Sequence, residues 1–273
     1  MMRPEGPRVV IFGAPLDLTS SYRSGTRFGP PQIRAAGEGL EDYSLSLNRD
    51  VRQVNVIDQG DLELPPGNLE ASLARIEKEA DTVLENGLPF IVLGGEHLIT
   101  LPLVKAALAR YPDLVLLQLD AHADLAESYE GELFTHATVM RRVAELLESQ
   151  RIVQMGIRSA TAEEMAFARH WTNFFPGSPT DADRVLKLLT GKPVYLTIDL
   201  DVVDPAFAPG VSTPEPDGWS SGELFQVLSR MADLQVVGMD LVEVCPNYDP
   251  AGITSTLAAK VLRESLLTFF YPS

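Results

Sequence analysis

The sequence predicts an α/β protein with a mostly parallel sheet of about eight strands, in one domain that spans residues 1–273. Apolar runs alternate with helical patterns along the whole chain, and no Pro/Gly/Ser-rich linker interrupts them. Some of these runs, such as 114–117, are apolar at every position. A strand of that kind has both faces buried, which is typical of a parallel sheet covered by helices on both sides.

The expected strands are short apolar segments bounded by turn residues. They span Arg8–Phe12, Val54–Asp58, Pro89–Leu93, Leu114–Asp120, Ile152–Ile157, a weaker run Trp171–Phe175, Val194–Asp199 and Leu234–Leu241. Helical periodicity between them predicts helices over Leu69–Asn86, Ile99–Arg110, Ala137–Ser149, Ser221–Met231 and Thr254–Phe270. The Pro-rich segment Asp204–Asp217 predicts a long functional loop.

The composition narrows the classes of partner. With 38 acidic and 22 basic side chains the net charge is −16, so nucleic acid and anionic membranes are poor partners and small cations are better ones. Solubility alone would also explain the charge. The single cysteine, Cys245, excludes a disulfide within the chain, and Met1–Pro7 contains no apolar signal segment. We therefore expect a cytoplasmic protein.

Side chains that bind metals follow three of the expected strands, and Glu243 follows the last one. In strand order they are His97, then Asp120, His122 and Asp124, and then Asp199 and Asp201. Ligands bind outside the carboxyl ends of parallel strands, and these residue types bind borderline to hard divalent cations. If the backbone is extended there, residues 120, 122 and 124 project together, and so do 199 and 201.

Six candidate ligands exceed the three or four that one metal ion needs, so we expect two ions with bridging carboxylates. Four aspartates in one crevice would repel one another without cations. The alternative is that each Asp only caps a turn or a helix, which fits any single one better than the whole set. Two such metals favour a bridging water of lowered pKa, a nucleophile near neutral pH.

The remaining candidates are less certain from the residues alone. His136 lies at the expected start of a helix and is either a proton shuttle or a surface histidine. His170 lies in a charged stretch and is expected to be structural or exposed. We expect Cys245 to be a small packing residue rather than a nucleophile.

Three motifs, Gly94-Gly95-Glu96-His97, Asp120-Ala121-His122-Ala123-Asp124 and the segment 197–205, resemble the metal-binding signatures of the ureohydrolases. That family includes arginase, agmatinase and formiminoglutamase. The resemblance begins at residues 21–30 and extends through residues 240–244 to the last helix. It implies the arginase-like three-layer α/β/α sandwich, assembled as a homo-oligomer, a trimer or a hexamer.

The resemblance also implies roles for the candidate residues. Two manganese ions (Mn²⁺) would be held by His97, Asp120, His122, Asp124, Asp199 and Asp201. The catalytic residues would be His136, Glu243 and Asp124. Of these, His136 would relay protons and contact the substrate, and Glu243 would bind its guanidinium group.

The substrate is suggested by departures from arginase. Arginases carry an Asn two residues after the last Asp of the second motif, where this chain has Ala126, and Ser-Gly-Asn where it has residues 132–134. Segments 127–132 and 244–249 are similar to those of agmatinases. The resemblance therefore implies hydrolysis of agmatine to urea and putrescine, a step of polyamine biosynthesis, by a metal-bridging hydroxide.

Other functions remain open at this point. The same motifs fit ureohydrolases for N1-aminopropylagmatine, guanidinobutyrate, guanidinopropionate or arginine. A zinc deacetylase on a similar fold would have fewer metal ligands. A non-catalytic metal-binding relative would keep the ligands without turnover.

Overall fold

The computed structural model describes residues 8–272; Met1–Pro7, where we expect no signal segment, and Ser273 lie outside the described residues. Its main sheet has eight strands, and neighbouring strands are parallel throughout. They are β1 (Arg8–Ala14), β4 (Asn55–Asp61), β5 (Phe90–Gly94), β6 (Val115–Leu119), β7 (Ile152–Met155), β8 (Thr172–Phe175), β9 (Pro193–Asp199) and β10 (Gln235–Val242). A small antiparallel hairpin joins β2 (Tyr43–Ser44) to β3 (Arg49–Asp50). All eight expected strands form, including the weaker one.

Eight α-helices accompany these strands in residues 8–272. They are α1 (Gly29–Gly37), α2 (Leu69–Glu85), α3 (Thr100–Arg110), α4 (Val139–Leu146), α5 (Ala162–Trp171), α6 (Ala182–Leu189), α7 (Ser221–Arg230) and α8 (Ile253–Phe269). The five predicted helices form within a few residues of their expected bounds. Three short helices, α1, α5 and α6, were not predicted. Each buries only two or three residues, and α1 has prolines at its second and third positions.

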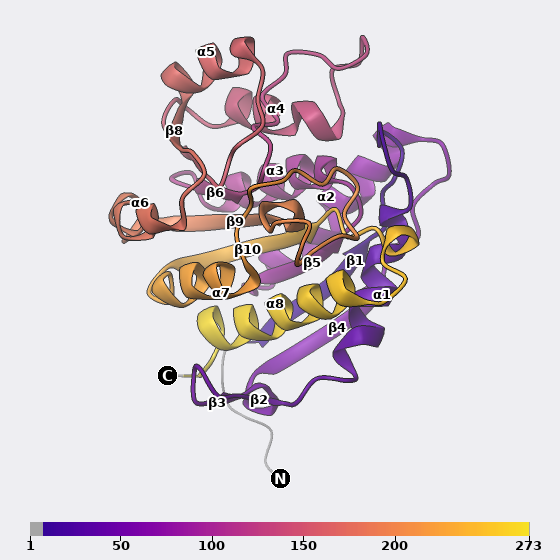
Figure 1. Cartoon of the computed structure of the whole chain (residues 1–273), viewed down its shortest axis with the longest axis vertical. Helices are drawn as coiled ribbons and strands as arrows, with labels where there is room; N and C mark the ends of the chain where they lie inside the picture. The colour runs from indigo at the N-terminus through magenta and orange to yellow at the C-terminus, as the bar shows by residue number, and fades with distance from the viewer. Residues whose placement is uncertain (1–7, 273) are drawn as a thin grey trace.

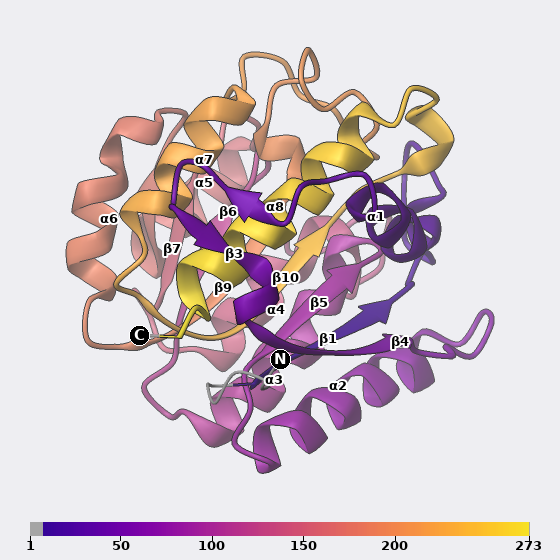
Figure 2. The same ribbon diagram turned by 90° about the horizontal axis from the view of Figure 1, so that it is seen from below.

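The helices form two layers around the sheet. Side chains of α1, α6, α7 and α8 pack into one hydrophobic core, and those of α2, α3, α4 and α5 pack into the other. Figure 2 shows β1, β5 and β10 between α8 on one side and α2 and α3 on the other. The predicted α/β/α sandwich is therefore confirmed. Its sheet is open, with the strand order β4-β1-β5-β10-β9-β6-β7-β8.

The strand order places the predicted site at the middle of the sheet. The strands followed by candidate site residues are β5, β10, β9 and β6, which are consecutive neighbours (Figure 1). Since all are parallel, their carboxyl ends lie side by side at one edge. The sheet thus brings together residues as distant in the chain as His97 and Glu243, which are 146 positions apart.

Among residues 8–272, no helix combines the length and the apolar character needed to cross a bilayer. The Pro-rich segment after β9 forms the long loop expected from the sequence: between the short 3₁₀ helix η6 (Leu200–Val202) and α7 it contains no further helix or strand.

Candidate metal centre

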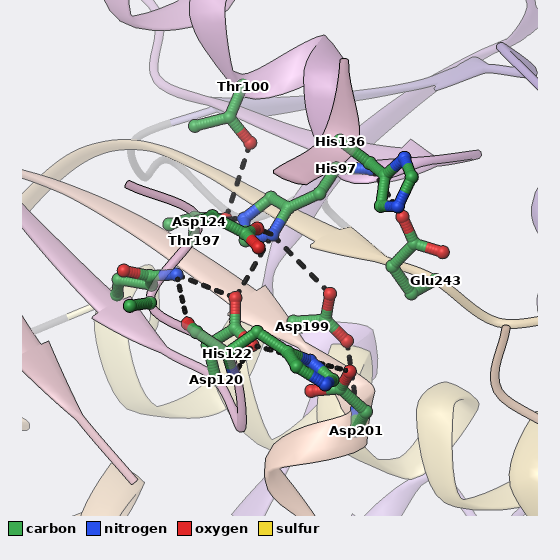
Figure 3. A network of polar contacts seen from close by, with 12 residues as sticks. His97, Thr100, Asp120, His122, Asp124, His136, Thr197, Asp199, Asp201 and Glu243 are labelled. Carbon is green, nitrogen blue, oxygen red and sulfur yellow. Dashed lines mark hydrogen bonds and ion pairs between the residues drawn. The ribbon is translucent and has the colours of Figure 1, made fainter. Parts of the chain in front are cut away.

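The predicted metal ligands meet at the carboxyl edge of the sheet (Figure 3). The imidazole Nδ1 of His97 lies 3.1 Å from Oδ2 of Asp120 and 3.0 Å from Oδ2 of Asp124. Oδ2 of Asp199 lies 3.4 Å from the same nitrogen. His97 therefore faces three carboxylates, two from the loop after β6 and one from the end of β9.

A second group lies next to the first and shares one residue with it. Nδ1 of His122 lies 2.9 Å from Oδ2 of Asp201 and 3.8 Å from Oδ1 of Asp120. Asp120 thus presents one carboxylate oxygen to each histidine. The possible ligand atoms of His97, Asp120 and Asp124 lie within 4.8 Å of one another, and so do those of Asp120, His122 and Asp201. This arrangement fits two neighbouring cations with a shared carboxylate.

The convergence of the second motif does not arise from strand geometry. β6 ends at Leu119, so the extended backbone expected over residues 120–124 is wrong. Asp124 has φ 52°, in the left-handed region that Asp tolerates better than most residues. His122 forms an isolated bridge with Ser159, beyond the end of β7. A bent loop, rather than alternation along a strand, brings the three side chains together.

The same correction applies to the third motif. Asp199 is the last residue of β9, but Asp201 lies in η6, in the first turn of that 3₁₀ helix. The backbone N–H of Asp201 donates to Oδ1 of Asp199 at 2.9 Å, so Asp199 caps the turn with one oxygen. Its other oxygen remains free to face His97. Capping and metal binding are therefore compatible in one aspartate, not alternatives.

Gly95 and Glu96, which precede His97, direct it into the site. A Cβ on Gly95 would lie 1.9 Å from the carbonyl oxygen of Leu16, so only glycine fits where β5 ends. The backbone N–H of Gly95 donates to the carbonyl of Ala14, and that of Glu96 to the carbonyl of Leu16. The close approach turns the chain into the short 3₁₀ helix η3 (His97–Ile99), with His97 at its start.

The environment of His97 provides a test of whether a metal ion fits. The side chain is 1% exposed, and its Nε2 lies 2.9 Å from Oγ1 of Thr197. Its Nδ1 has no partner in hydrogen-bond geometry among the described residues, although three carboxylates surround it. A buried nitrogen lone pair facing carboxylates is unfavourable unless a cation or a proton lies between them. Imidazole and carboxylate groups are suitable ligands for such a cation.

The pKa shifts of the two histidines show the same need for positive charge. Burial by itself lowers the pKa of His97, but Asp120, Asp124 and Asp199 outweigh it and hold that pKa well above its usual value. For His122, burial is likewise outweighed, chiefly by Asp201, and its pKa is raised to about 11. Without a metal, the carboxylates hold protons on both rings.

The surroundings of the carboxylates shift their pKa values in opposite directions. Burial, together with the charges of Asp201 and Asp124, raises the pKa of Asp120 to about 7. Burial also raises the pKa of Asp199 well above its usual value. At Asp201 burial acts in the same direction, but His122 outweighs it and lowers the pKa to about 2. The positive charge of the two histidines is therefore too small to balance the four carboxylates. Divalent cations would supply the missing positive charge.

Glu243 lies beside the metal ligands with its carboxylate held at both oxygens. Its backbone has φ 66°, and its N–H donates to the carbonyl of Gly95 at 2.9 Å. Oε1 accepts the backbone N–H of His97 at 2.6 Å, and Oε2 accepts the hydroxyl of Ser212. Burial raises the pKa of Glu243 to about 7. Because a carboxylate has about four acceptor positions, both oxygens can still receive a donor from a bound molecule.

His136 is held by the loop that follows β1. Its backbone N–H donates to Oγ1 of Thr19 at 3.0 Å, and its Nε2 lies 3.2 Å from Oγ of Ser21. The ring of Tyr129 approaches it edge-on, with 5.7 Å between centroids. Buried Glu96 fixes this loop by accepting the N–H of Thr19 at 2.7 Å. His136 starts a 3₁₀ helix that leads into α4, as its place in the sequence predicted.

The ligands and these outer residues enclose one cavity of about 160 Å³. The side chains that line it are Ser21, His97, His122, Asp124, Tyr129, His136, Ala137, Asp199, Asp201, Ser212, Thr213 and Glu243. His136 is therefore placed at the site rather than on the open surface, and its role stays a prediction.

The acidic segment expected at the far end of the substrate is placed differently. Glu127, Glu130 and Glu132 are all exposed, and none of them lines the cavity. Tyr129 is the only residue of segment 127–132 that does. Exposed carboxylates act on a ligand only through a screened field, so direct contact with the far end is not supported by this placement.

Two other expectations are confirmed. His170 is exposed near the end of α5, away from the candidate centre. Cys245 is buried, and burial raises the pKa of its thiol to about 11, so the thiolate needed of a nucleophile is not formed near neutral pH.

The polar residues that support the site through hydrogen bonds were not predicted from the sequence. They are Glu96, Gln118, Thr197, Ser212 and Asp240. For Gln118 and Thr197 a signal was present, since each is a polar residue in an otherwise apolar strand, two positions before a predicted ligand. Gln118, for example, donates its amide N–H to Oδ2 of Asp120 at 2.6 Å.

Comparison with known proteins gives consistent results over nearly the whole chain. The model of the arginase family matches residues 7–268. An agmatinase of Bacillus subtilis (strain 168) is 44% identical over 98% of this chain and 94% of its own length. A solved structure from Clostridium difficile superposes with a TM-score of 0.94 at 38% identity, covering 97% of this chain and 98% of that one. The agmatine ureohydrolase of Thermoplasma volcanium gives 0.87 at 37% identity, over 97% and 90% of the two chains.

Proposed function

The chain belongs to the arginase family of hydrolases, and we propose that it is an agmatinase that uses two manganese ions to split agmatine and water into urea and putrescine. The observation that carries this proposal is the pair of His/Asp groups that share Asp120, next to the buried carboxylate of Glu243. A metal pair and a carboxylate for a guanidinium are the two parts that this reaction needs.

The first part of the proposal concerns the metal. The residues that would hold two ions are His97, Asp120, His122, Asp124, Asp199 and Asp201. Four carboxylates and two imidazoles favour manganese over zinc, which prefers sites with fewer and softer ligands. Two divalent cations held there would polarise a water molecule into a nucleophile near neutral pH.

Glu243 is proposed to bind the guanidinium group. Each of its oxygens already accepts one donor, from His97 and Ser212, and these contacts fix the plane of the carboxylate. The remaining acceptor positions suit the parallel N–H groups of a planar guanidinium. Such a cation would also favour the charged form of Glu243, whose pKa burial raises to about 7.

His136 is proposed to transfer a proton to the leaving amine. The reaction forms a bond from the water oxygen to the guanidinium carbon and breaks the bond from that carbon to the alkyl nitrogen. The amine that leaves needs a proton, and Nε2 of His136 faces the cavity beside Ser21, where a hydroxyl can pass a proton on. Thr19 Oγ1 accepts the backbone N–H of His136 and lies 3.5 Å from Nδ1 of its ring, so the side chain needs little reorganisation.

Agmatine is preferred to other guanidino compounds on two grounds. The named relatives with high identity are agmatinases. In addition, the arginase positions that read an amino acid carboxylate hold Ala126 and Glu132–Phe134 here. A substrate carboxylate would find no paired donor in these residues, a mismatch that usually lowers kcat/KM strongly.

The proposal is tested by release of urea from one manganese-loaded preparation. We expect kcat/KM for agmatine to exceed that for arginine and guanidinobutyrate by more than ~100-fold, the scale of a missing polar partner. If arginine or guanidinobutyrate matches agmatine, the substrate assignment is wrong while the ureohydrolase chemistry stands. If no guanidino compound releases urea from a protein that holds manganese, the enzymatic proposal itself fails.

A further inference from the structure

Asp240 has a fully buried carboxylate near the candidate metal centre, and the proposed reaction gives this residue no role. It lies in β10, two residues before the end of that strand, and is 0% exposed. Three hydroxyl groups donate to it: Oγ1 of Thr197 to Oδ1 at 2.6 Å, and Oγ1 of Thr100 and the Tyr195 hydroxyl to Oδ2 at 2.9 and 2.7 Å. A buried charge with this many fixed donors requires an explanation, because an apolar residue would otherwise be favoured there.

The contacts continue from Asp240 to a metal ligand. Thr197 donates its only hydroxyl proton to Asp240, so towards Nε2 of His97, 2.9 Å away, it can act only as an acceptor. The proton of a neutral His97 ring must then be on Nε2. This leaves the lone pair on Nδ1, the nitrogen that faces Asp120, Asp124 and Asp199. Figure 3 shows Thr197 beside His97 on the side away from Glu243.

The second histidine lacks an equivalent arrangement. The side chain of His122 is 22% exposed, against 1% for His97. Among residues 8–272 no side chain hydrogen-bonds to Nε2 of His122, which leaves that nitrogen to solvent. The orientation of His97 is therefore fixed by the protein interior, whereas that of His122 depends on its contact with Asp201.

We propose that Asp240, acting through Thr197, is a positioning residue that fixes the His97 ring in the tautomer able to bind a metal ion. This rests on the proposed metal centre and assigns the buried Asp240–Thr197 pair to one of its two ions only. Outer partners of this kind typically raise metal affinity ~10–100-fold. The other ion, which His122 would bind, is outside the reach of the pair.

Asp240→Asn tests this with little change of shape. The amide oxygen can replace Oδ2 and keep the bonds from Thr100 and Tyr195, while the amide nitrogen takes the place of Oδ1 and donates to Thr197. The hydroxyl of Thr197 then donates to His97, which moves the ring proton to Nδ1 and blocks the metal-binding lone pair. We expect one of two Mn²⁺ ions to bind ~10–100-fold more weakly and the other to bind as in the wild type.

Companion variants separate this role from a merely structural one. Tyr195→Phe removes a donor to Asp240 but leaves the path to His97, so both Mn²⁺ affinities should be unchanged. Thr197→Val should reproduce the loss seen with Asp240→Asn, and Thr197→Ser should restore binding. If Asp240→Asn does not fold, the comparison of Thr197→Val with Thr197→Ser still tests the proposed role.

Mn²⁺ titration of the metal-free proteins, followed by electron paramagnetic resonance of the free ion, gives both affinities without any assay of turnover. Equal binding in wild type, Asp240→Asn and Thr197→Val would overturn the positioning role while leaving the proposed function intact. Equal weakening by Tyr195→Phe would overturn it too, since that variant keeps the path to His97. A wild-type protein that binds no Mn²⁺ would overturn the metal centre and this inference together.

Discussion

The inner and outer parts of the site are built in different ways. The inner part consists of the candidate metal ligands at or just after the ends of β5, β6 and β9, among which His97, Asp120 and Asp201 are at most 1% exposed. The outer part is the loop 126–136, where most side chains are exposed and only Tyr129, with His136 at its end, lines the cavity. Buried side chains beside the rigid sheet suit chemistry that needs fixed distances, and an exposed loop suits the choice of substrate.

Changing an inner ligand should have the largest effect. Asp124→Asn or Asp201→Asn keeps the shape but removes the charge that two cations require. We expect turnover to fall by more than the ~10–100-fold typical of supporting residues, together with a lower manganese content. The matched control is Glu130→Gln, which removes an exposed carboxylate of the outer loop. Wild-type metal content in both Asp variants would contradict the ligand assignment.

His136→Ala should separate the two parts. Because His136 lies outside both ligand groups, manganese content should be retained while kcat falls ~10²–10⁴-fold, the usual contribution of a positioned acid or base. His170→Ala, which changes an exposed histidine far from the cavity, is the control and should leave kcat unaltered. Turnover of His136→Ala within about twofold of the wild type would remove His136 from the mechanism.

The inner part should also give the metal-free protein an unusual pH dependence. Burial raises the pKa of Glu96, Asp120 and Glu243 to about 7, so the folded chain keeps protons that the unfolded chain loses above their ordinary values near 4. The free energy of unfolding should then fall as the pH rises from about 4 to 7, because the folded chain binds more of these protons than the unfolded chain.

His122 acts in the same direction at higher pH. Its pKa of about 11 lies above the unfolded value of 6.5, so its contribution is complete below about pH 6.5 and is lost as the pH rises towards 11. Urea denaturation of chelator-treated protein at pH 5, 6, 7 and 8, with and without Mn²⁺, measures both effects. Mn²⁺ should replace the protons and flatten the curve. Metal-free protein that becomes more stable between pH 5 and 7 would contradict the assigned shifts.

The smallest effect is expected from the outer carboxylates. Glu127, Glu130 and Glu132 are exposed, and exposed charges contribute about 0–1 kcal/mol. Replacing all three with Gln should therefore change kcat/KM for agmatine by less than about fivefold, and mainly at low salt. The comparison with Tyr129→Ala, which alters the cavity wall itself, should show a larger change. A much greater effect of the triple variant would mean that the loop closes over bound substrate.

Most of the fold could be predicted from the sequence, because buried parallel strands are continuous apolar runs, as at Val115–Leu119. The inner residues followed from the rule that ligands bind at strand ends. The path of the backbone between them could not be predicted, since no turn motif in the local sequence indicates the left-handed conformation of Asp124. Nor could the role of Asp240, because its hydroxyl partners come from α3 and β9, distant in sequence.

The most direct test of the proposed function is whether urea release from agmatine requires two bound manganese ions per chain. Metal-free protein should be titrated with Mn²⁺, and urea release from agmatine should be followed at each point. Activity should be absent without metal, rise with added Mn²⁺ and level off at two ions per chain. Full activity after complete removal of metal, or a plateau with no bound manganese, would contradict it.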